Sequence, residues 1–248
     1  LTQITIPSSV TSIGDKAFSD CSSLTQITIP SSVTSIGNDA FSKCTSLTQI
    51  TIPSSVTSIG KNPFAHCTSL EKIFVDSANS KYVSIDNVLF THDIRTLICY
   101  ACHNKGNTYK IPSSVTSIED YAFSSCTSLT QITIPSSVAS IGKNPFVFCS
   151  NLVNIYIDSG NSKFSSDDDV FFTKDHKTLI CYPCKLNPNK YSIPSSVTSI
   201  ENYAFSECRS LTQITIPSSV TSIGDSAFSS CSSLTQITIP SSVTSIGD

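Results

Sequence analysis

The 248-residue sequence contains no tryptophan and no methionine, and only 13% of its residues are charged. That fraction is about half of the usual value for a soluble domain, and the net charge is only −3. Lysine and arginine form no run, so the basic stripe with which a protein contacts nucleic-acid phosphates is missing. No apolar stretch reaches the roughly 18–20 residues of a membrane span, and no signal segment is recognisable. We therefore expect neither nucleic-acid binding nor membrane insertion by this segment.

Sequence motifs for catalysis are missing as well. The chain has no G-x-S-x-G motif, no phosphate-binding Walker loop and no dinucleotide-binding fingerprint. Its histidines form no His-x-x-x-His pair: they are His66, His92, His103 and His176. Serine is abundant, but no adjacent base is indicated that would activate one of them as a nucleophile. We expect no enzymatic activity and no cofactor.

What the sequence does contain is a 23-residue repeat. The phrase LTQITIPSSVTSIG begins at residues 1, 24, 47, 211 and 234, and a variant with one substitution begins at residue 129. The Ile-Pro steps are spaced by 23 or by 59 residues: Pro7, Pro30, Pro53, Pro112, Pro135, Pro194, Pro217 and Pro240. The 59-residue spacings define two long units, at residues 70–128 and 152–210, which match each other at an offset of 82 residues. A period of this length indicates a repeat architecture.

Residues 24–46 show how one unit is expected to fold. Ile27 and Ile29 alternate with polar residues, which predicts a strand with one buried face. Pro30 lacks an N–H group and ends this strand. A second short extended stretch follows, and the next segment is predicted to form a single helical or 3-10 turn that directs Phe41 and Cys44 inwards. The few apolar side chains of one unit do not offset the entropy of ordering it, so each unit must stack on its copies.

Stacking would place equivalent residues in rows about 4.8 Å apart, the spacing of hydrogen-bonded strands. A β-propeller blade needs about 40 residues, so the unit is too short for that alternative. One row would contain the phenylalanines Phe18, Phe41, Phe64, Phe123, Phe146, Phe205 and Phe228. Another, a structural core ladder, would contain Cys21, Cys44, Cys67, Cys126, Cys149, Cys208 and Cys231.

The unit resembles the BspA-like leucine-rich repeats, whose pattern is LxxIxLPxxLxxIGxxAFxxCxx. The resemblance covers nearly all of the chain, and seven units carry the signature of Ala or Pro, then Phe, then Cys. It implies a right-handed leucine-rich-repeat solenoid of cell-surface or secreted proteins, for which adhesion to host proteins is the usual proposed role. The long units look like the hairpin-bearing variant of the protozoan members. Ser32 stands where general leucine-rich repeats have asparagine, so we expect no asparagine ladder.

We therefore predict one domain, residues 1–248, with a β-rich solenoid fold. It would be a right-handed leucine-rich-repeat superhelix with parallel strands, short helical or 3-10 turns and two inserted β-hairpins. The hairpins are expected where extended runs flank polar turns, with runs at 87–90 and 97–100 and again at 169–172 and 179–182. Residues 71–110 and 153–190 contain 19 of the 33 charged residues, which indicates that recognition chemistry lies in these inserts.

The outward faces of the predicted strands carry regular Gln and Thr rows, which the long units interrupt with aromatic and basic residues. Such residues are favoured at protein interfaces. The candidate contact residues are Phe74, Tyr156, Lys72, Asn154, Lys110, His92, Arg95, Lys174, His176 and Lys177. An uninterrupted threonine face would suggest ice binding, a remote alternative that these interruptions disfavour.

Two C-x-x-C pairs, Cys99 with Cys102 and Cys181 with Cys184, are candidates for local disulfides or for packed thiols. Zinc and redox chemistry are weaker alternatives, because three strand rows would separate the two pairs and a shared zinc needs all four ligands at one point. The run Asp167, Asp168 and Asp169 invites a calcium interpretation, but the matching insert has no acidic cluster, which favours a solvated loop. We expect no metal site.

We interpret the chain as a non-enzymatic binding module of the cell surface or of a secreted protein. By resemblance, its partners would be host or extracellular-matrix proteins. A structural solenoid that self-associates end to end is the alternative, because neither end of this chain carries a polar cap.

Overall fold

The computed structural model describes residues 2–104, 106–186 and 189–248. The chain winds through about ten turns of a parallel β-solenoid of the leucine-rich-repeat type. None of the described residues lies in a helix long and apolar enough to cross a membrane. Two compact units are present: one consists of Leu1–Gly106, Ser114–Ser128 and Ser140–Phe146, the other of Asn107–Ser113, Leu129–Ala139 and Val147–Asp248. The single domain proposed above stays a prediction, and four of its residues, Leu1, Lys105, Asn187 and Pro188, lie outside the described residues.

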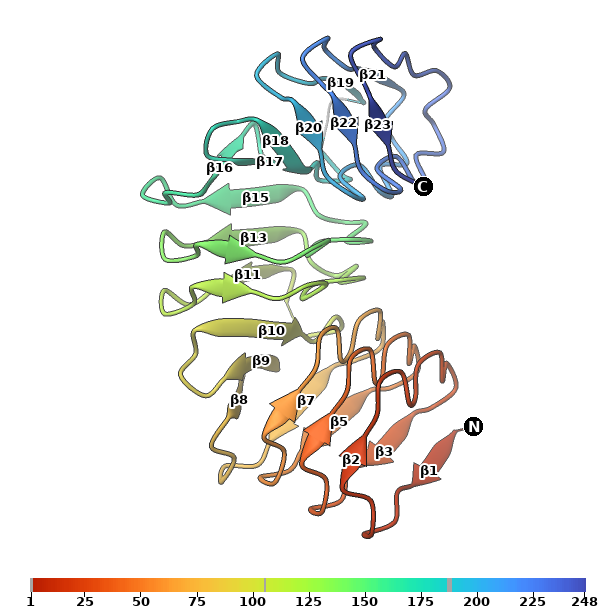
Figure 1. Cartoon of the computed structure of the whole chain (residues 1–248), viewed down its shortest axis with the longest axis vertical. Helices are drawn as coiled ribbons and strands as arrows, with labels where there is room; N and C mark the ends of the chain where they lie inside the picture. Colours follow the sequence, from red (N-terminus) through yellow and green to blue (C-terminus); the bar gives the residue numbers. More distant parts are fainter. Residues whose placement is uncertain (1, 105, 187–188) are drawn as a thin grey trace. The chain divides into compact units, whose positions relative to one another are not determined.

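Among its described residues the first unit contains four sheets, and Figure 1 shows several of their strands side by side. Strands near the Ile-Pro steps form the sheets β1-β3 (Gln3–Thr5, Gln26–Thr28) and β5-β7 (Gln49–Ile52, Lys72–Val75). The shorter Ser-Ile strands form the sheet β2-β4-β6 (Ser12–Ile13, Ser35–Ile36, Ser58–Ile59). The fourth sheet is β14-β12-β10-β9-β8 (Ser140–Ile141, Ser117–Ile118, Thr96–Tyr100, Val88–Thr91, Tyr82–Ile85).

The second unit contains three sheets built on the same plan. Two consist of strands near the Ile-Pro steps: β11-β13-β15 (Thr108–Lys110, Gln131–Ile134, Asn154–Ile157) and β19-β21 (Lys190–Ser192, Gln213–Thr215). The third is β16-β17-β18-β20-β22-β23 (Phe164–Asp167, Val170–Thr173, Thr178–Cys181, Ser199–Ile200, Ser222–Ile223, Ser245–Ile246).

Successive turns lie in register at an offset of 23 residues, as the repeat predicts. Ile4 pairs with Ile27 in parallel strands, and Ile13 pairs with Ile36. The expected loss of the asparagine ladder is compensated by serine: Ser32 Oγ donates a hydrogen bond of 2.7 Å to the Val10 carbonyl of the preceding turn. The same bond recurs at Ser55, Ser219 and Ser242. A serine ladder therefore satisfies the carbonyl groups that asparagine would otherwise bind.

The predicted helical or 3-10 turns are wrong, because the described residues of these segments form turns with left-handed residues instead. In residues 39–44, Asp39 and Lys43 have φ of 52° and 59°. Alternate N–H groups then point along the stack: those of Asp39, Phe41 and Lys43 donate to carbonyl groups of the next turn at 2.7–2.9 Å. Glycine is needed for a different reason at Gly37, where an added Cβ would collide with the backbone of Asp15 in the preceding turn.

The central members of the phenylalanine and cysteine rows are buried in the core, whereas Phe18, Cys21, Phe228 and Cys231 are partly buried. In the first unit the ring centroids of Phe18, Phe41 and Phe64 are 5.3 and 5.6 Å apart in sequence order. Tyr100 continues the same row, because its ring lies 5.3 Å from that of Phe123. In the second unit Tyr182 lies 5.2 Å from Phe205 in the same way. The sequence analysis did not assign either tyrosine to this row, because both lie within C-x-x-C motifs that were interpreted through their cysteines.

Each predicted β-hairpin is present and has one more strand than expected. β9 and β10 are antiparallel, and β8 pairs with the other edge of β9. The turn between β8 and β9 consists of Asp86 and Asn87, both with positive φ, which is the conformation of a two-residue type I′ turn. We call β8, β9 and β10 the first meander, and the equivalent β16, β17 and β18 the second meander. Each meander continues into the solenoid, since β10 pairs in parallel with β12 and β18 with β20.

Candidate interaction surface

Phe74 is the most exposed aromatic side chain of the strand faces, with 46% of its surface accessible. It lies in β7, where alternation buries Ile73 and turns Lys72 and Phe74 outwards. Lys72 pairs with Gln49, and Phe74 pairs with Thr51 of β5. The structure therefore brings these two predicted contact residues to one face of the sheet, where an apolar ring stands among polar neighbours.

The second unit repeats this arrangement on β15. Tyr156 is 43% exposed and pairs with Thr133 of β13, which in turn pairs with Lys110 of β11. Asn154 Nδ2 donates a hydrogen bond of 2.8 Å to the Tyr156 hydroxyl oxygen, which holds the ring along the strand. Lys110, Asn154 and Tyr156 thus share one face, as the sequence predicts.

The predicted contact residues of the inserts lie in the loops that close the two meanders. His92 and Arg95 are exposed in the first loop, and Lys174 and Lys177 are exposed in the second. His176 is different, because its ring stacks on Phe172 at 5.1 Å and its Nε2 atom lies 3.1 Å from Ser165 Oγ. His176 therefore contributes to the packing of the second meander as well as to its surface.

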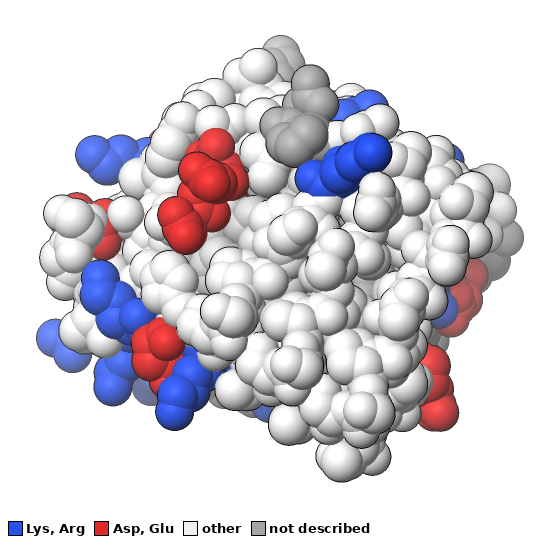
Figure 2. Space-filling model, turned by 90° about the horizontal axis from the view of Figure 1, so that it is seen from above, with Lys and Arg blue, Asp and Glu red and all other residues white. Residues whose placement is uncertain are grey.

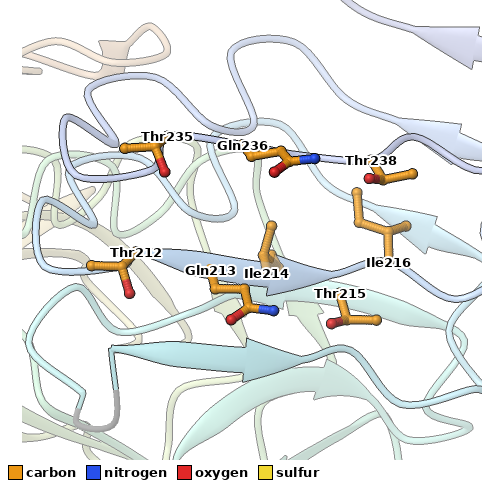
Figure 3. A pocket seen from close by; sticks show the side chains of 8 residues that line it. All are labelled: Thr212, Gln213, Ile214, Thr215, Ile216, Thr235, Gln236 and Thr238. Carbon is orange, nitrogen blue, oxygen red and sulfur yellow. The ribbon is translucent and has the colours of Figure 1, made fainter.

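A groove of about 530 Å³ runs between β21 and residues 235–238. Figure 3 shows like side chains of the two segments opposite one another: Thr212 and Thr235, Gln213 and Gln236, Thr215 and Thr238, with Ile214 and Ile216 between them. These hydroxyl and amide groups belong to the regular Gln and Thr rows and offer hydrogen bonds without charge. The groove has no group suited to acid–base chemistry.

Charge is sparse on the surface. Figure 2 shows wide uncharged areas between small groups of charged residues, and residues of both signs lie together in some of these groups. Three ion pairs illustrate this mixing: Lys43 with Asp20, Lys61 with Asp120 and Arg209 with Glu207. Both side chains of the Lys43–Asp20 pair are exposed, and such a pair contributes little to stability. In the other two pairs the cation is exposed and the carboxylate is largely buried.

The structure has the four cysteines of the C-x-x-C pairs as free thiols, which corresponds to the packed-thiol alternative. The local disulfides stay a prediction. Cys102 Sγ donates to the Ser124 carbonyl oxygen at 3.0 Å, and Cys184 Sγ donates to that of Ser206 at 2.9 Å. Burial raises the pKa of Cys99 well above its usual value, with a smaller contribution from Cys102, and acts in the same way on Cys181. Raised pKa values mean little thiolate, the form that attacks disulfides or binds metals.

Asp168 and Asp169 form the two-residue turn between β16 and β17, with φ of 47° and 64°. They occupy the position of Asp86 and Asn87 in the first meander, so their backbone role is that of a hairpin turn. Within the described residues, no three His, Cys, Asp or Glu side chains come together in a way that would hold a metal ion.

Sequence reasoning missed a serine–histidine contact. His66 Nδ1 lies 2.9 Å from Ser125 Oγ, and the His66 ring meets the Tyr121 ring edge-on at 5.8 Å. Burial lowers the pKa of His66, assisted by the nearby charge of Lys43. Ser125 is only 6% exposed, so its hydroxyl is shielded from a substrate. The contact connects the turn at residues 62–66 with the turn at residues 121–125, and the 59-residue separation hides it in the sequence.

Comparison with known proteins gives a consistent result. Six copies of a family model described as "BspA type Leucine rich repeat region" match residues 1–98, 92–181 and 178–248. The solved structure of a leucine rich cell surface protein from Faecalibacterium prausnitzii is 34% identical, with a TM-score of 0.68 over 100% of this chain and 59% of that chain. The pneumococcal vaccine antigen PcpA is 26% identical, with a TM-score of 0.51 over 98% of this chain and 51% of that chain. No curated protein matches the sequence.

Proposed function

Because the chain belongs to the BspA-type leucine-rich repeat family, we propose that it is a protein-binding module of the cell surface that adheres to host or extracellular-matrix proteins. The family is generally non-enzymatic, and the F. prausnitzii relative is named a cell surface protein. Repeats of this family serve as protein-binding or adhesion modules in general. To this general role the proposal adds two points, the cell-surface location and the class of protein partner.

The exposure of Phe74 and Tyr156 is the observation that carries this proposal. Each stands on a strand whose neighbouring outward residues are Gln or Thr, and each occupies the same position in its long unit. Aromatic side chains supply much of the energy of protein interfaces, because they bury a large area at a small cost in conformational entropy.

The proposal is tested by a binding screen against extracellular-matrix and host-surface proteins, with wild type beside Phe74→Ala/Tyr156→Ala. We expect the double variant to lose about 2 kcal/mol of binding free energy, since truncation of a central aromatic residue costs this much. Thr51→Ala/Thr133→Ala is the matched control, because these threonines pair with Phe74 and Tyr156 in the same sheets. Binding that survives the aromatic substitutions in full would refute the assignment of the contact surface.

A third variant, with the loops at residues 91–96 and 173–178 shortened, tests whether the inserts also contact the protein partner. Weaker binding by this variant is expected if residues such as Arg95 and Lys177 form the rim of the interface. Light scattering across protein concentration accompanies every arm, because self-association is the alternative function. A chain that stays monomeric while it binds supports adhesion, and concentration-dependent growth without a partner supports self-assembly.

A further inference from the structure

The loops that close the two meanders gather basic residues that are far apart in the sequence. The N–H group of His92 donates to the Lys81 carbonyl at 2.8 Å, which places a residue at the end of β9 beside one that precedes β8. Arg95 lies three residues further along the same loop. In the second meander, the N–H group of Lys174 donates to the Lys163 carbonyl at 2.8 Å, and Lys177 follows. We call Lys81, His92 and Arg95 the first basic cluster, and Lys163, Lys174 and Lys177 the second.

A buried asparagine fixes the first member of each cluster. Asn79 is 2% exposed, and its Nδ2 donates to the carbonyl groups of Pro53 and Val56. Its Oδ1 accepts hydrogen bonds of 2.9 Å from the N–H groups of Lys81 and Tyr82. Asn161 makes the equivalent four bonds and holds Lys163. The backbone of each lysine is thereby anchored to the solenoid core.

A turn aspartate fixes the last member of each cluster, Arg95 or Lys177. Asp93 Oδ1 accepts from the Thr91 hydroxyl at 2.6 Å and from the Arg95 N–H group at 3.1 Å. Asp175 accepts from Thr173 and Lys177 in the same way. These bonds, chiefly those from the threonine hydroxyls, lower the pKa of both carboxyl groups. The second cluster therefore has three lysines and a single turn aspartate, Asp175. The first cluster has Lys81, His92 and Arg95 and a single turn aspartate, Asp93.

The first cluster opens onto a hollow of about 400 Å³, lined by Ser80, Lys81, Thr91, His92, Asp93 and Thr96. Its hydroxyl groups and cations suit a ligand that carries both anionic oxygens and alcohol groups. The imidazole of His92 is the one aromatic ring among these lining residues, and no Phe, Tyr or Trp lies there as a stacking platform for nucleic-acid bases. Lysine stands at the Arg95 position in the second cluster, and its point charge does not give the bidentate geometry typical of phosphate recognition by arginine.

From this geometry we propose that each basic cluster, with the hydroxyl groups beside it, binds a sulfated polysaccharide. Sulfate oxygens accept from the lysine, arginine and imidazole groups, and the sugar hydroxyls bond to Ser80 and Thr96 or to their counterparts Ser162 and Thr178. Asp167, Asp168 and Asp169 lie at the opposite end of the β16–β17 hairpin, so they leave the basic end accessible to an anion. This inference goes beyond the protein-binding function proposed above, because it assigns a second class of ligand to the closing loops, whereas Phe74 and Tyr156 carry the protein-binding proposal.

The test measures binding of a size-defined heparin oligosaccharide to the full chain by isothermal titration calorimetry. We expect Lys163→Gln/Lys174→Gln to weaken binding about tenfold, with Lys81→Gln/His92→Gln having a smaller effect, since exposed charge-assisted contacts each contribute modestly. Lys16→Gln/Lys190→Gln is the matched control, because it removes the same charge from exposed residues outside both clusters. Binding should also weaken as salt is raised to about 0.15 M, where exposed charges are screened.

Two further ligands test whether binding depends on the sulfate groups and whether phosphate can replace them. Chemically desulfated heparin should bind at least tenfold more weakly than the sulfated form, and inorganic polyphosphate should not match it. Equal losses in the control and cluster variants, or equal binding of either probe, would overturn the proposal. Circular dichroism of each variant shows whether it is folded. If a double variant unfolds, the single variant Lys177→Gln replaces it in the binding measurement. Failure here leaves the protein-binding function intact, because Phe74 and Tyr156 report on that function separately.

Discussion

The two meanders have the same internal framework and different outer chemistry. Their buried asparagines, their two-residue turns and the aspartate of their closing loops make equivalent hydrogen bonds. At one half-buried position the first meander has Tyr82, where the second has Phe164. The Tyr82 hydroxyl accepts from the Ile59 N–H group at 2.8 Å, whereas Phe164 packs on Phe171 with centroids 5.5 Å apart. The comparison teaches that both meanders have the fully buried asparagine, whereas a half-buried position can hold either a hydrogen-bonding tyrosine or a packed phenylalanine.

The largest effect is expected at the shared framework. Asn79→Ala and Asn161→Ala should each lower the free energy of unfolding by roughly 3 kcal/mol, since both leave buried carbonyl and N–H groups without partners. Guanidinium denaturation measures the two losses. Asn107→Ala, at an exposed residue, is the control and should stay within about 0.5 kcal/mol of wild type. Unequal losses at the two asparagines would contradict the conclusion that the two meanders share one framework.

A smaller difference is expected at the substituted position. Tyr82→Phe should cost about 1 kcal/mol, because the Ile59 N–H group loses its acceptor. Phe164→Tyr is the reciprocal variant and should change stability by less than about 0.5 kcal/mol. Hydrogen exchange at the Ile59 amide provides a local measurement, and it should accelerate only in Tyr82→Phe. Unchanged protection would mean that the hydroxyl is dispensable there.

The contact between His66 and the turn at residues 121–125 should give the two compact units different pH responses. His66 occupies the place that Phe148 has in the second unit, where the Phe148 ring meets Tyr203 edge-on at 6.0 Å. The pKa of His66 is lowered in the folded chain, so folding favours neutral imidazole. Stability should therefore fall as the pH drops through the unfolded histidine pKa of about 6.5. His66→Phe should flatten the unfolding profile between about pH 7 and 5, and the other three histidines remain as internal controls. An unchanged slope in His66→Phe would contradict this.

The smallest effect is expected in the closing loops at acidic pH. Since their hydrogen bonds lower the pKa of Asp93 and Asp175 in the folded chain, the bonds are complete above the unfolded value of about 3.9 and are lost as the pH falls below it. Amide chemical shifts of Arg95 and Lys177 should move together over this range. Asp93→Asn should remove the change at Arg95 and leave Lys177 as the control. A change at Arg95 that persists in Asp93→Asn would assign the titration to another group.

Much of the fold follows from the repeat, because a fixed period forces equivalent residues into rows. The period therefore predicts the pairing of Ile4 with Ile27 and the stacking of Phe18 on Phe41. It does not predict the turn at residues 39–44, where Asp39 and Lys43 adopt the left-handed region that glycine usually occupies. The sequence predicts the outward positions of Phe74 and Tyr156, since strand alternation determines them. The basic clusters could not be anticipated, because the pairing of β8 with β9 that brings Lys81 beside His92 was not predicted.

The serine ladder has a consequence for how such a chain changes over generations. Each serine bonds to a backbone carbonyl of the turn before it, and backbone groups are the same in every turn. A turn inserted or deleted by recombination between near-identical gene segments therefore meets a neighbour that already fits it. The length of the protein can vary without redesign of its interior, whereas the meanders, which depend on single residues such as Asn79, must be inherited whole.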